Sequence, residues 1–68
     1  MTVDAALAGD LVAGDAVEVA ANDYGRNPIA GTLVAWEAGE IVILREDERA
    51  GAIMVHFPNT GFEVSRPT

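Results

Sequence analysis

The sequence predicts an all-β fold, a small five-stranded barrel preceded by a short N-terminal helical turn. Apolar and polar residues alternate with a period of two in several short runs, and turn-forming residues separate these runs at regular intervals. The chain has 68 residues, so we expect residues 1–68 to form a single domain. Five short strands in so small a chain favour a barrel, because a curled sheet hides its edges.

The N-terminal third predicts a weak helix and one strand. Residues 4–13 are small, apolar or acidic, which is enough for one or two helical turns. A Gly-Asp turn then leads into a strand at 16–20, where Val17 and Val19 share one face. Residues 22–28 are dense in turn formers and end in a proline, so we expect a long hairpin loop there.

The rest of the chain predicts four further strands. Residues 29–36 form a strand in which Gly31 marks a bulge or tight bend. The next run is rich in β-branched residues, which favour strands. The remaining strands are expected at 41–44, 52–57 and 62–65, with turns at 37–40, 45–49 and 59–61.

One segment resembles a known family. Between residues 31 and 44 the chain has a glycine, a leucine two positions later, an aromatic-acidic pair and an apolar run that ends in leucine. This order is similar to the first sequence motif of the Sm-like family, and the matching positions are Gly31, Leu33, Trp36, Glu37 and Leu44. The resemblance implies an SH3-like or Sm-like barrel, more than an activity, because Ile41 stands where that family has its RNA-contacting asparagine.

Acidic side chains dominate the charge. The chain has eleven carboxylates, four arginines, no lysine and a net charge of -7. Such a charge repels itself in dilute buffer, whereas at molar ionic strength the Debye length falls to about 3 Å. The composition therefore predicts a halophilic protein, of haloarchaeal origin. An acidic mimic of nucleic acid, or a partner for a basic protein, would have the same composition.

Several classes of function are disfavoured. The absence of cysteine removes thiol catalysis, thiolate zinc sites and disulfides, and it fits a reducing cytoplasm. There is no signal-peptide pattern and no run of about 18 apolar residues, so we expect a cytoplasmic protein that does not enter a membrane. So short a chain has marginal stability, which favours a homo-oligomer.

A nucleic-acid-associated module is the first functional hypothesis. Binding needs cations for phosphates and flat side chains for bases. We take Tyr24, Arg26 and Asn27 on the first long loop as candidates for the contact surface. Trp36 and Arg66 are further candidates for the same surface. Each also has a structural interpretation, because Tyr24 and Asn27 are ordinary turn residues and Trp36 could close the core. RNA is the expected partner.

A protein-interaction or self-assembly module is the alternative, acting through an exposed strand edge at 53–57. An enzyme is not expected. The single histidine, His56, is interpreted as a surface residue. The acidic run 46–48 lacks the ligand spacing of a calcium loop, so we interpret it as a solvated hairpin tip. We expect no metal site, no catalytic residue and no cofactor.

Overall fold

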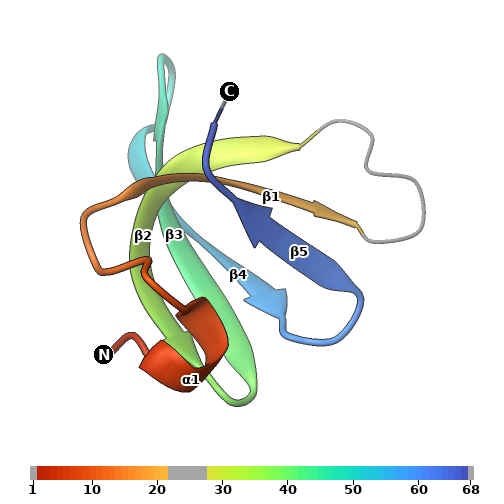
Figure 1. The fold of residues 1–68 in the computed structure, drawn as a ribbon. Helices are drawn as coiled ribbons and strands as arrows, with labels where there is room; N and C mark the ends of the chain where they lie inside the picture. Colours follow the sequence, from red (N-terminus) through yellow and green to blue (C-terminus); the bar gives the residue numbers. More distant parts are fainter. Residues whose placement is uncertain (1, 22–27, 68) are drawn as a thin grey trace.

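The computed structural model describes residues 2–21 and 28–67. Its elements are one short helix, α1 (Ala5–Ala8), and five strands, β1 (Ala16–Ala21), β2 (Ile29–Glu37), β3 (Glu40–Asp47), β4 (Gly51–Pro58) and β5 (Phe62–Ser65) (Figure 1). The predicted all-β class is confirmed, and so is the short helical turn at the N-terminus.

The strands form one antiparallel sheet in the order β4-β3-β2-β1-β5. The prediction of a barrel is wrong, because the sheet is open. A closed barrel needs a backbone ladder between its outermost strands, and the ladders of the described residues end at β4 and β5. These strands approach each other through side chains, with the rings of Phe57 and Phe62 centred 5.3 Å apart.

β2 changes its neighbour along its length. On one edge it pairs with β3 from Thr32 to Glu37, with a register shift between Leu33 and Ala35. On the other edge β1 pairs only with the first part of β2, from Ile29 to Thr32. The second part of that edge is therefore left for another segment.

The N-terminal segment, residues 2–15, occupies this second part of the edge. Leu33 N–H donates to the carbonyl of Asp15 at 2.8 Å, and Gly14 N–H donates to the carbonyl of Leu33 at 2.8 Å. Further along, Trp36 exchanges hydrogen bonds with Thr2 and Asp4, in a short parallel bridge. The backbone groups of β2 are thus satisfied beyond the end of β1.

The core lies on the inner face of the sheet. β1 contributes two side chains that are 1% exposed, which confirms the predicted shared face, and the N-terminal segment adds Ala8 and Leu11. The largest core side chains with less than 2% exposure are Val17, Val19, Leu33, Ile41 and Ile43. Half-buried Phe62 and Val64 of β5 pack against it. Val42, between two core residues, is also buried, so β3 has apolar side chains buried on both faces.

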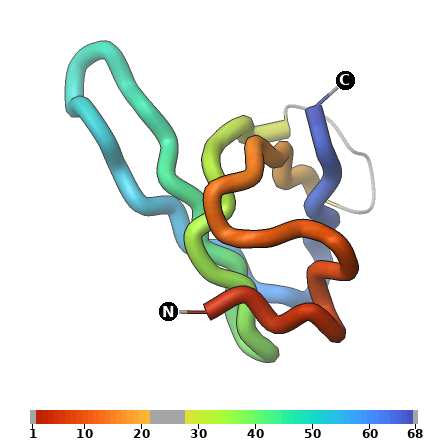
Figure 2. Tube along the Cα trace, turned by 60° about the vertical axis from the view of Figure 1, so that its left-hand side comes forward, coloured from red at the N-terminus to blue at the C-terminus, as the bar shows by residue number. Residues whose placement is uncertain are grey.

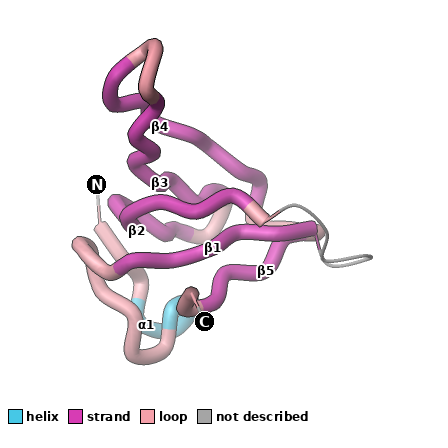
Figure 3. Tube along the Cα trace, turned by 90° about the horizontal axis from the view of Figure 1, so that it is seen from above, coloured by secondary structure: helices cyan, strands magenta, loops and turns pink. Residues whose placement is uncertain are grey.

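The β3–β4 hairpin extends away from the rest of the molecule (Figures 2 and 3). Its ladder runs from the pair Glu40 and Pro58 to the pair Asp47 and Gly51. The predicted charged turn at 45–49 is therefore shorter than expected, because strand pairing continues through Asp47. The turn itself comprises residues 48–50, and Gly51 supplies the positive φ of 78° that follows it.

None of the described residues forms a helix of the length and apolar character that crossing a bilayer requires.

Gly31 permits the close approach of β2 and β3. A β-carbon at this position would lie 2.7 Å from the carbonyl oxygen of Leu44 and 3.0 Å from Cδ1 of Ile43. The nearer atom belongs to the backbone, so it cannot move aside without shifting the strand. The sequence predicted a bulge or tight bend at Gly31, but the register shift lies between Leu33 and Ala35. The glycine at position 31 instead allows the two strands to approach closely.

We expect Gly31→Ala to destabilise the fold by about 1–3 kcal/mol, the usual cost of overpacking. Urea unfolding followed by circular dichroism measures this loss. Gly39→Ala is the matched control, because an added β-carbon there meets nothing within 4 Å. A Gly31→Ala variant as stable as the control would contradict the close approach of the two strands.

Candidate functional site

The predicted nucleic-acid site is only partly within the described structure. Tyr24, Arg26 and Asn27 lie outside the described residues. Trp36 lies near the end of β2, and Arg66 follows β5. The two remaining candidates have different contacts, described in turn below.

Trp36 has the contacts of a structural residue. Its half-buried ring packs against the core, and its Nε1–H donates to Oδ1 of Asn59 at 3.0 Å. Nδ2 of Asn59 in turn donates to the carbonyl of Ala38 at 3.1 Å. Asn59 thereby joins the β4–β5 turn to the β2–β3 turn. Sequence reasoning treated Asn59 only as a turn former, since no local pattern indicates a partner 23 residues away.

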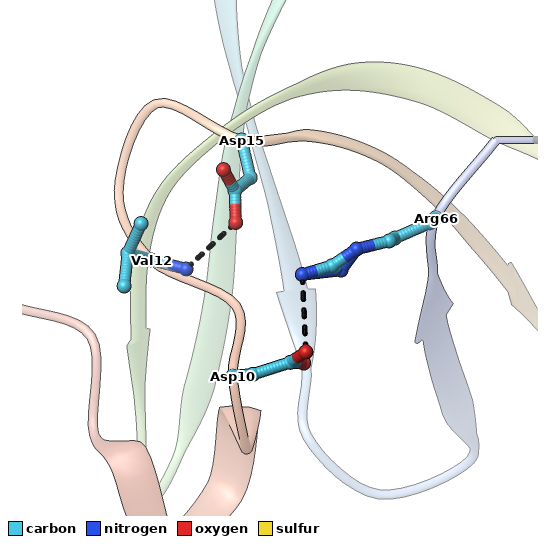
Figure 4. A network of polar contacts seen from close by, with 4 residues as sticks. All are labelled: Asp10, Val12, Asp15 and Arg66. Atoms are coloured by element: carbon cyan, nitrogen blue, oxygen red, sulfur yellow. Dashed lines mark hydrogen bonds and ion pairs between the residues drawn. The ribbon is translucent and has the colours of Figure 1, made fainter.

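Arg66 contacts the N-terminal segment. Its Nη2 lies 3.3 Å from Oδ2 of Asp10, and both side chains are more than half exposed. Nearby, the N–H of Val12 donates to Oδ2 of Asp15 at 3.0 Å. Figure 4 shows the two contacts side by side, with Arg66 reaching from the end of β5 toward the loop after α1. An exposed ion pair of this kind stabilises a fold by at most about 1 kcal/mol.

His56 faces an acidic partner across the β3–β4 ladder. Its Nδ1 lies 3.2 Å from Oε2 of Glu40, and the two side chains are 53% and 54% exposed. The placement at the surface agrees with the interpretation made from the sequence. A single exposed histidine and one carboxylate supply only two of the four ligands of a structural zinc site.

The tip of the β3–β4 hairpin is built around Asp47. Its Oδ1 accepts hydrogen bonds from the N–H groups of Arg49 at 2.7 Å and Ala50 at 3.1 Å. These bonds, with the charge of Arg45 as a smaller contribution, hold the pKa of Asp47 below its ordinary value of 3.8. The Asp47 carboxylate therefore stabilises the turn at the hairpin tip through its hydrogen bonds to the turn backbone.

The buried side chains of the described residues carry no ionisable group. Within residues 2–21 and 28–67, every buried side chain is apolar, and no three His, Asp or Glu side chains gather where they could hold a metal ion. The concavity at the hairpin tip is lined only by the exposed or half-exposed residues 45–49. Residues that act in acid-base catalysis usually have a pKa that is shifted by burial or by a close charged partner.

Comparison with known proteins found no matching family model and no matching curated protein. Among solved structures, the chain is similar to the crystal structure of a GST-like protein from Pseudomonas syringae. The TM-score is 0.80 and the sequence identity is 44%. The match covers 84% of this chain and 20% of that chain, so this chain spans a fifth of the length of the protein it resembles.

This comparison overturns the functional hypotheses made from the sequence. A GST-like neighbour at 44% identity points away from an RNA-binding barrel, and the strand-edge interaction module fits it no better. The SH3-like or Sm-like assignment gains no support from it. The prediction of a halophilic protein was based on composition alone, and the similarity to a GST-like protein gives it no support.

The contact between Trp36 and Asn59 predicts a measurable coupling. Trp36→Phe keeps an aromatic ring and removes the donor, whereas Asn59→Ala removes the acceptor. We expect each variant to lose about 1 kcal/mol of unfolding free energy, and the double variant to lose less than the sum. Urea unfolding of all four proteins gives the coupling energy.

Thr60→Ala is the control for this cycle, because Thr60 is exposed in the same turn. Additive losses in the double variant would show that the two side chains do not interact.

The lowered pKa of Asp47 predicts a pH dependence with a definite sign. Because the folded state holds the pKa below the ordinary value of 3.8, ionised Asp47 stabilises the fold above that pH. This stabilisation is lost as the pH falls through the folded-state pKa. We expect the unfolding free energy of the parent to fall more steeply with acid than that of Asp47→Asn.

Two measurements check this expectation. Urea midpoints of the parent and the variant between about pH 5 and pH 2 give the difference. An NMR titration of the Asp47 side-chain carboxyl gives the midpoint itself. A midpoint at or above the ordinary value would contradict the hydrogen-bonded turn.

Proposed function

We propose that this chain is a non-catalytic all-β unit of the kind that forms part of a GST-like protein. The observation that carries the proposal is the unequal coverage of the match. Nearly all of this chain is similar to a segment that makes up only 20% of the GST-like chain. In this proposal the chain supplies the curved sheet, and group-transfer chemistry belongs to the remainder of a GST-like protein.

The packing of the chain supports a structural role. The core cluster combines side chains from the N-terminal segment and from the strands of the sheet. Residues far apart in the sequence are joined by short hydrogen bonds, such as those between Asp15 and Leu33 and between Trp36 and Asn59. A sheet whose strand edges and turns are tied in this way keeps one shape, which is what a larger protein requires of a constituent unit.

The chemistry of the side chains also supports a non-catalytic role. Activation of a thiol for group transfer needs a base, or a group that stabilises a thiolate, at a sheltered position. In the part of the chain that the structure describes, the ionisable side chains lie at the surface or are half-buried at most. The proposal therefore places substrate binding outside this chain. The predicted cytoplasmic location and homo-oligomeric state remain predictions.

A transplant into the similar protein tests the proposal. The matching segment of the Pseudomonas syringae protein is replaced by the corresponding residues of this chain. We expect the chimera to elute at the volume of its parent in size-exclusion chromatography and to melt in one cooperative transition. The expectation follows from the TM-score of 0.80 and the 44% identity of the two segments.

The control chimera carries Ile41→Asp, which places a charge at a core position that is 0% exposed. It should lose the cooperative transition, because an unpaired charge is buried. If the chimera without this substitution aggregates while this chain folds on its own, the proposed correspondence between the two segments is wrong.

A binding measurement tests the non-catalytic part of the proposal. Isothermal titration of the isolated chain with glutathione should show no saturable heat at concentrations up to about 1 mM, which corresponds to about -4 kcal/mol of binding free energy. A saturable isotherm in this range would contradict the assignment of substrate binding to the rest of a GST-like protein. Circular dichroism of the same sample confirms that the chain is folded.

A further inference from the structure

We draw no further inference here: the strongest candidate, the apolar surface around exposed Met54 on the outer face of β3 and β4, is an unpartnered sheet face, and nothing in the described part of the structure shows what covers it.

Discussion

The satisfaction of backbone hydrogen bonds along β2 is the constraint on which the other elements depend. β2 has nine residues, and β1 pairs with only its first part, from Ile29 to Thr32. Beyond that point the N–H and C=O groups on this edge would have no partner in β1, and an unpaired backbone group costs free energy. Residues 2–15 resolve this by running along the vacant edge, and in doing so they deliver Ala8 and Leu11 to the core.

The course of β2 also bears on why the sheet is open. The close approach of β2 and β3 at Gly31, together with the register shift between Leu33 and Ala35, changes the course of β2 within the sheet. Among the described residues β4 and β5 form no ladder, and the rings of Phe57 and Phe62 pack against each other. Side-chain packing here takes the place of the backbone ladder that would close a barrel. A sheet can thus surround its core without a continuous ring of hydrogen bonds.

Local patterns in the sequence predicted the strands well. Period-two alternation located β1 and β5, and turn formers located the gaps between the strands. The hairpin strands are longer than predicted, because cross-strand pairing carries charged residues such as Arg45 and Glu46 within β3. Composition treats such residues as turn formers, whereas a ladder accepts them wherever one face of the strand meets water.

Features that join distant segments could not be predicted in the same way. Residues 2–4 show no alternation that indicates pairing with β2, and a lone asparagine at position 59 gives no sign of its tryptophan partner. Whether β4 and β5 form a ladder also depends on the path of the whole chain. The candidate site had an even weaker basis in the sequence, because Tyr, Arg and Asn are common in loops of proteins with many different functions.

The projecting β3–β4 hairpin has a practical consequence. Its tip at residues 48–50 is exposed. Next to the tip, residues 45–47 of β3 pair with residues 51–53 of β4, and in the described register β2 does not extend this far along β3. Extra residues placed between Glu48 and Arg49 would disturb the turn at Asp47 and leave the core cluster untouched. The tip is therefore the natural position at which to display a peptide epitope or an affinity tag on this scaffold.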